Sequence, residues 1–125
     1  LYQNIEDFNQ LPGNLHPYDS SLRKTVLGSS RYGTPYKTLG GILHENLNYL
    51  DFDPSAYSWE ANQQMLDCAI GHNDEFILST TERDYPSYEK YADSYLYKEI
   101  EYLKAFGYTV STSPASDGYY RMVPP

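Results

Sequence analysis

Short β-prone runs alternate with helix-like segments along this chain, and this alternation limits the fold more than any single residue does. Strands that are separated by helices usually form a sheet that is at least partly parallel. We therefore predict an α/β or α+β fold, in which helices pack on a small, partly parallel sheet and a β-hairpin lies at the C-terminal end. The expected elements are a helical turn at 22–24, strands at 25–27, 47–52 and 75–80, helices at 36–45, 53–70 and 88–106, and a hairpin of 108–110 with 119–123.

The length of 125 residues is typical of a single domain. We expect residues 1–19 to form an irregular N-terminal arm and residues 20–125 to form the compact core, because Pro12-Gly13 and His16-Pro17 favour turns and extended backbone. The single cysteine, Cys68, excludes an internal disulfide, and its apolar neighbours indicate a buried thiol rather than a nucleophile. No apolar run approaches the ~20 residues that span a bilayer, so we expect no membrane-spanning segment.

Charge is distributed unevenly along the chain. The net charge of −8 argues against phosphate binding and favours a basic partner. However, Asp and Glu are absent between Ser20 and His44, and a local basic site in an acidic protein can still attract an anion. The alternative is that this segment packs against an acidic face of the same domain. The candidate substrate-binding residues in the segment are Arg23, Lys24, Ser29, Ser30 and Lys37.

The same segment contains a candidate catalytic site. The strand expected at 25–27 leads into Gly28-Ser29-Ser30 and Arg31, which would form an anion cradle of backbone N–H groups and a guanidinium. Cleavage of RNA without a metal needs a proton-transfer group with a near-neutral pKa and cations that hold the phosphate. Because His16 and His44 flank the basic segment, we predict that these histidines and Arg31 are catalytic residues of a metal-independent ribonuclease.

Metal and cofactor chemistry is not indicated by the sequence. The three histidines are scattered, and neither paired cysteines nor a His-Glu metal motif occurs. We therefore predict no metal site and no cofactor.

The C-terminal half contains an ordered series of short motifs. In chain order they are Trp59 with Asn62, Leu66-Asp67 with Ala69-Ile70, Asn73-Asp74, Phe76-Ile77-Leu78, Glu99 with Tyr102-Leu103, Gly107-Tyr108 and Met122-Val123. This order resembles the C-terminal effector (toxin) region of bacterial polymorphic or contact-dependent toxins that are carried by filamentous-haemagglutinin or Rhs-type proteins. The resemblance covers residues 57–125 and departs from the pattern at Asn73, where Gly is usual.

The resemblance implies a biological setting. It implies a domain that is secreted as part of a larger carrier, of which this chain would be the C-terminal part, and that acts in the cytoplasm of a target cell. It also implies a cognate immunity protein as partner. Together with the acid-free basic segment, it leads us to expect RNA or another phosphate-bearing molecule as substrate, and the need for a helper protein in the target cell stays open. Such carriers deliver enzymes of several kinds, so the resemblance does not select one reaction.

Two alternatives to a ribonuclease stay open. An acidic protein-binding module, such as an immunity protein, would agree with the net charge and the fifteen tyrosines, which suit an interface. A NAD-consuming or ADP-ribosylating toxin would need a phosphate-binding loop and a carboxylate, and Glu99 or Glu101 would supply the carboxylate. Ser79-Thr80-Thr81 together with Glu99-Ile100-Glu101 resembles mono-ADP-ribosyltransferases, although the acidic pair falls inside a predicted helix. Glu99 is therefore a further candidate catalytic residue.

Overall fold

The strands and helices form the predicted type of fold. The computed structural model of the chain describes residues 5–28, 47–79, 95–116 and 118–125. Its elements are α1 (Ile5–Asn9), β1 (Lys24–Leu27), the 3-10 helix η2 (Pro54–Ala56), α3 (Trp59–Gly71), β2 (Glu75–Leu78), α4 (Tyr95–Ala105), β3 (Thr109–Val110) and β4 (Tyr120–Val123). The described strands form a sheet in the order β1-β2-β4-β3, in which β1 and β2 are parallel and β4 is antiparallel to both β2 and β3. The predicted partly parallel sheet and C-terminal hairpin are therefore confirmed.

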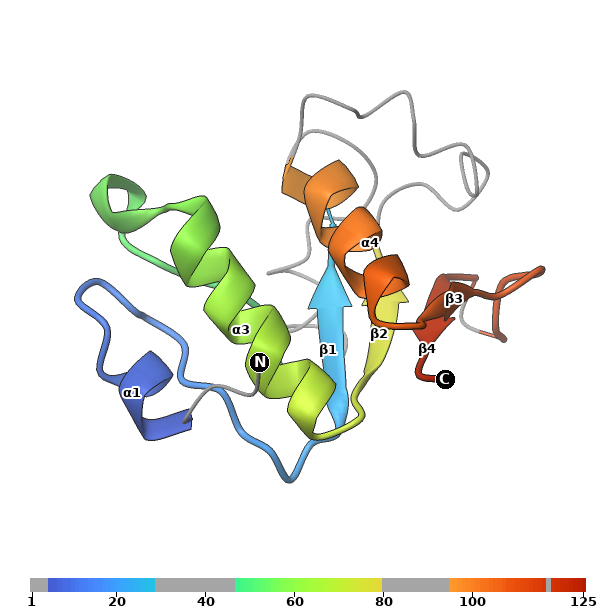
Figure 1. The fold of residues 1–125 in the computed structure, drawn as a ribbon, viewed down its shortest axis with the longest axis horizontal. Coiled ribbons are helices and arrows are strands. Elements are labelled where there is room, and N and C mark those ends of the chain that lie inside the picture. Colours follow the sequence, from blue (N-terminus) through green and yellow to red (C-terminus); the bar gives the residue numbers. More distant parts are fainter. Residues whose placement is uncertain (1–4, 29–46, 80–94, 117) are drawn as a thin grey trace.

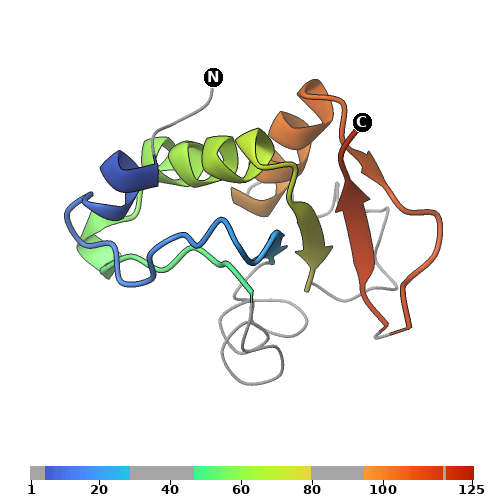
Figure 2. The ribbon, with the colours of Figure 1, turned by 90° about the horizontal axis from the view of Figure 1, so that it is seen from below.

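Helices α3 and α4 lie side by side on one face of the sheet (Figures 1 and 2). Successive strand residues point to opposite faces. Phe76 and Leu78 accordingly belong to the main core, whereas Ile77 packs with Val26 in a smaller cluster. The helices contribute Met65, Leu66, Ala69, Leu96, Ile100 and Leu103 to the main core. Each large apolar side chain that is fully buried there contributes about 1.5–3 kcal/mol, so this layer is the main source of stability.

The N-terminal segment is more ordered than the sequence suggested. Residues Ile5–Asn9 form α1, and Phe8 packs into the core with a ring contact to Phe52 at 6.0 Å between centroids. Tyr18 is buried as well. The expectation of an irregular arm is therefore wrong at residues 5–9, because a helix of little more than one turn gives too short a periodic signal to detect, whereas residues 10–19 form turns and one isolated bridge.

The expected helical turn at 22–24 is also wrong. The Asp19 side chain accepts hydrogen bonds from the backbone N (2.9 Å) and the Oγ (2.6 Å) of Ser21, which builds a turn instead. Arg23 then adopts a left-handed backbone conformation with φ 62°, and β1 begins at Lys24.

Residues 47–52 flank β1 without forming the expected strand. The backbone N of Val26 donates to the carbonyl of Asn48 at 2.8 Å, and the N of Asn48 donates to the carbonyl of Lys24 at 2.9 Å. These bonds make an isolated parallel bridge, which covers the outer edge of β1 but does not continue along it.

The helix expected at 53–70 is interrupted near its start. Asp53 accepts a hydrogen bond from the Ser55 N and caps η2. Ser58 then takes an extended conformation (φ −153°), and its side chain accepts from the Ala61 N at 3.0 Å, so that α3 begins at Trp59.

Helix α4 confirms the C-terminal part of the helix expected at 88–106. Residues 88–94 and the helix expected at 36–45 lie outside the described residues. Gly107, with φ 91°, ends α4 in the way the sequence predicted. Among the described residues, no helix combines the length and the apolar character needed to cross a bilayer.

Candidate functional site

The parallel strands β1 and β2 end at the same edge of the sheet, because Leu27 pairs in register with Leu78. We call this edge the carboxyl edge. Figure 1 shows that α3 and α4 both start at this end of the molecule and run back along the sheet. Ligands of open α/β sheets bind beyond the carboxyl ends of the strands, so this edge is where a site is expected.

Two buried polar side chains meet between the helices, one turn in from their starts. Asn62 of α3 is 1% exposed and Glu99 of α4 is 6% exposed, and the Asn62 side chain forms a hydrogen bond with the Glu99 carboxyl group. The Asn62 Oδ1 has no hydrogen-bond partner among the described residues, so the donor to Glu99 is the amide Nδ2.

Burial controls the protonation of this carboxyl group. Desolvation raises the pKa of Glu99 to about 8, and the hydrogen bond from Asn62 opposes part of that rise. Glu99 is therefore mostly protonated at neutral pH, and its pKa lies in the range that suits a proton-transfer group. Of the predicted catalytic residues that the structure describes, Glu99 has the environment closest to that of a catalytic acid.

An aromatic cluster is formed by residues of the same two helices. The Trp59 ring lies 6.1 Å from the Tyr95 ring and 6.1 Å from the Tyr102 ring, measured between centroids. The Lys98 Nζ lies 5.7 Å from the centroid of Trp59 and 5.5 Å from that of Tyr95. Tyr102 is fixed in turn, because its hydroxyl donates to the Asp67 Oδ1 at 2.6 Å. We call this contact region of the two helices the α3–α4 seam.

Ser79 also lies at the carboxyl edge. It is fully buried, its backbone N donates to the Leu27 carbonyl at 2.8 Å, and its Oγ has no partner among the described residues. However, the alternation along β2 places Ser79 on the face of Ile77, opposite the helices. The resemblance to ADP-ribosyltransferases rests on the segments that contain Ser79 and Glu99. Ser79 therefore faces away from the helix layer that contains Glu99.

Asp74 joins the elements at the other end of the sheet. Its Oδ2 accepts from the Tyr18 hydroxyl at 3.0 Å and from the Thr25 Oγ1 at 2.8 Å, and the Tyr108 hydroxyl donates to its carbonyl oxygen at 2.8 Å. Burial raises the pKa of Asp74. Asp74 thus connects the N-terminal segment, β1 and the segment before β3. These hydrogen bonds give Asp74, a residue of the motif series in the C-terminal half, a structural role.

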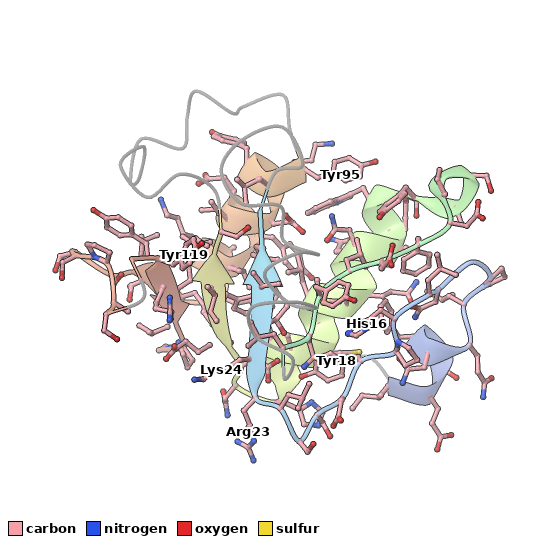
Figure 3. All side chains as sticks on the ribbon, turned by 180° about the vertical axis from the view of Figure 1, so that it is seen from behind. His16, Tyr18, Arg23, Lys24, Tyr95 and Tyr119 are labelled. Atoms are coloured by element: carbon pink, nitrogen blue, oxygen red, sulfur yellow. The ribbon has the colours of Figure 1, made fainter. Side chains whose placement is uncertain are left out.

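The predicted basic site is divided by β1. Figure 3 shows Arg23 and Lys24 at the start of this strand, and Lys24 pairs in register with Glu75. Gly28, the first residue of the predicted anion cradle, follows the far end of β1. A strand rises about 3.3 Å per residue, so the four residues of β1 keep Arg23 well away from Gly28. The remaining candidates, Ser29, Ser30, Arg31, Lys37 and His44, lie outside the described residues.

His16 lies apart from the other candidate residues. Its ring stacks on Tyr49, with centroids 3.8 Å apart and an interplanar angle of 15°. Burial lowers the pKa of His16, although a hydrogen bond with the Leu47 backbone and the charge of Asp51 act in the opposite direction. Figure 3 shows His16 separated both from Arg23 and Lys24 and from Tyr95 at the start of α4. The structure does not bring His16 to Glu99, and its catalytic role stays a prediction.

Cys68 is buried, as predicted. Burial and the nearby charges of Asp67 and Asp74 raise the pKa of its thiol to about 12. The thiolate is therefore scarce at neutral pH, which makes Cys68 a poor nucleophile. Within the described part of the chain, no three His, Cys, Asp or Glu side chains are grouped closely enough to hold a metal ion.

Asn62, the hydrogen-bond partner of Glu99, belongs to the motif series but was not predicted as a site residue. The sequence contains a signal for the arrangement, because Trp59 and Asn62 are three residues apart and Tyr95 and Glu99 are four apart, which places each pair on one helix face. What the sequence does not contain is the tertiary contact that puts these two faces together.

Comparisons of the chain with models of protein families, with curated proteins and with solved structures found no significant match. The resemblance to toxin effector regions stays a prediction.

Proposed function

We propose that this domain is a toxin-type enzyme that cleaves RNA without a metal ion, and that Glu99 gives a proton to the leaving group. The observation that carries the proposal is the Asn62–Glu99 pair, a carboxyl group buried between two helices at the carboxyl edge and held by one amide. Positioned proton transfer of this kind accelerates a reaction about 10²–10⁴-fold.

A purely structural role explains the pair less well. Burying a carboxyl group is costly unless its hydrogen bonds are made, and well-packed apolar residues usually stabilise such a position better. Here the Asn62 Oδ1 has no partner among the described residues, so the pair is incompletely satisfied. A carboxyl group whose pKa is strongly raised by burial, close to the edge of a sheet where ligands bind, is typical of a functional site.

The chemistry of RNA cleavage gives Glu99 a defined task. The 2′ oxygen attacks the phosphorus and loses its proton to water, while the bond from phosphorus to the 5′ oxygen breaks. The departing 5′ oxygen needs a proton, which the protonated Glu99 donates. The Asn62 amide then stabilises the resulting carboxylate, since a hydrogen bond from a donor favours the charged form.

Expression of the chain in bacterial cytosol, with growth and total RNA followed together, tests the proposal. The wild-type chain should arrest growth and produce RNA fragments. Glu99→Gln keeps the size and the neutral charge of the protonated side chain and should reduce cleavage by about 10²–10⁴-fold. Glu101→Gln is the matched control, because Glu101 is exposed on the same helix and should be dispensable.

Other outcomes of this experiment would reject the proposal in defined ways. Arrest with intact RNA would indicate a reaction on a dinucleotide or a protein instead. Normal growth with well-expressed, folded protein would favour the acidic binding module, and full toxicity of Glu99→Gln would exclude Glu99 as the proton donor. If the proposal holds, the target-cell cytoplasm is the expected place of action and a cognate immunity protein is the expected partner.

A further inference from the structure

We propose that Trp59, Tyr95 and Lys98 form a binding site for one base and the adjacent phosphate of single-stranded RNA, and we call these three residues the stacking platform. This inference rests on the proposed function, because it assigns the substrate-binding part of the same site. The platform consists of side chains of α3 and α4, and Lys98 directly precedes Glu99 in α4.

The geometry leaves ring surface available to a ligand. The Trp59 and Tyr95 rings are inclined at 58° and therefore do not stack on each other. Tyr95 is 41% exposed and is one of two large hydrophobic residues of the described chain with such exposure. Trp59 is half-buried, with one side against the edge of Tyr102 at 89°. An exposed tyrosine beside a half-buried tryptophan is a suitable surface for a nucleobase, which needs only a flat ring face.

Lys98 adds a cation at the same place. Its Nζ lies within 6 Å of both ring centroids, in the range of a cation–π contact. Among the described residues, Lys98 has no carboxylate within ion-pair distance. Its charge is therefore not neutralised there, and a flexible ammonium group can move from the ring faces to a phosphate.

The platform and the Asn62–Glu99 pair are adjacent on both helices. Trp59 is one turn before Asn62 in α3, and Lys98 is next to Glu99 in α4. A base on the rings would therefore lie within about one helical turn of Asn62 and of Glu99 along the two helices. The hydrogen bond from Tyr102 to Asp67 already fixes the ring that supports Trp59, so binding costs little side-chain conformational entropy there.

The fluorescence of Trp59 gives a direct test, because Trp59 is the only tryptophan of the chain. We would titrate the full chain carrying Glu99→Gln, which should cleave about 10²–10⁴-fold more slowly than the wild type, with a short single-stranded RNA oligonucleotide. Saturable quenching is expected. Tyr95→Ala should weaken binding by roughly 5- to 150-fold, the range that one base–aromatic contact contributes, whereas Tyr95→Phe should keep the affinity.

Salt dependence tests the role of Lys98. Lys98→Gln should reduce the slope of log affinity against log salt by about 0.7, as expected for one phosphate contact on a single strand. Lys104→Gln, at the exposed end of the same helix, is the matched control and should leave affinity and slope unchanged.

The outcomes separate this inference from the proposed function. Cleavage of RNA without quenching of Trp59, or an unchanged affinity of Tyr95→Ala, would overturn the stacking platform alone. Equal binding of duplex RNA would also overturn it, since paired bases offer no free face. Saturable quenching that depends on Tyr95, by a protein that cleaves no RNA, would support the platform and reject the proposed function.

Discussion

Glu99 holds its proton because two helices remove its carboxyl group from water. The side chain is 6% exposed, and a single amide hydrogen bond does not compensate for this burial. The same burial that tunes the group for proton transfer also makes the folded protein sensitive to pH. At the residue scale, function and stability are therefore linked through one pKa.

Stability should fall as pH rises through the range set by Glu99. Its pKa is raised from 4.5 to about 8, so between these values the native state keeps a proton that the unfolded state has lost. The contribution of Glu99 to the free energy of unfolding is fully present below the lower pKa and is lost as pH approaches the upper one. The free energy of unfolding should fall over this range by up to about 1.4 kcal/mol per pH unit. Urea unfolding across this range, for the wild type and for Glu99→Gln, checks the effect. The free energy of unfolding of Glu99→Gln should rise relative to that of the wild type as pH rises. A difference in unfolding free energy that stays constant with pH would contradict the prediction.

At the scale of elements, the sequence predicted the regular parts and missed the contacts between them. The apolar runs of β1 and β2 and the end of α4 at Gly107 follow from local patterns, and the structure confirms them. The interruption before α3 depends on Ser58, whose capping role the sequence analysis did not recognise. The sequence indicates Glu99 as a candidate catalytic residue, but its partner Asn62 lies on another helix, and only packing of the α3–α4 seam joins the two.

Tyr102 should stabilise this seam. Its hydroxyl donates to Asp67 at 2.6 Å, and its ring supports Trp59. Tyr102→Phe keeps the ring but leaves the Asp67 carboxylate without this donor, which should lower the free energy of unfolding by about 1–3 kcal/mol. Urea unfolding followed by Trp59 fluorescence measures the change. Unaltered stability would show that the bond contributes little.

On the scale of the whole molecule, the N-terminal segment belongs to the same core as the helices and the sheet. Phe8 and Tyr18 join the main core, and the Tyr18 hydroxyl reaches Asp74 at the turn before β2. The sequence did not predict this, because the two aromatic residues stand in a region of turns and prolines without a periodic pattern. Their burial depends on surfaces supplied by residues far along the chain.

Removal of the Phe8 side chain should therefore destabilise the entire fold. Phe8 is 1% exposed, and Phe8→Ala should lower the free energy of unfolding by about 3–5 kcal/mol through lost burial and a cavity. Leu15→Ala is the matched control, because Leu15 is 61% exposed and its loss should change stability by less than about 0.5 kcal/mol. Calorimetry measures the melting temperatures of the two variants. Equal melting temperatures of Phe8→Ala and Leu15→Ala would mean that the N-terminal segment does not contribute to the core.

The most direct measurement is the rate of RNA cleavage by the purified chain across pH, in the presence of a chelator, for the wild type, Glu99→Gln and Glu101→Gln. The wild type and Glu101→Gln should cleave at similar rates, which fall as pH rises past the Glu99 pKa of about 8 because the proton donor is lost. Glu99→Gln should be slower by about 10²–10⁴-fold and should lack this alkaline decline. Wild-type rates and an unchanged pH profile in Glu99→Gln would contradict the role assigned to Glu99.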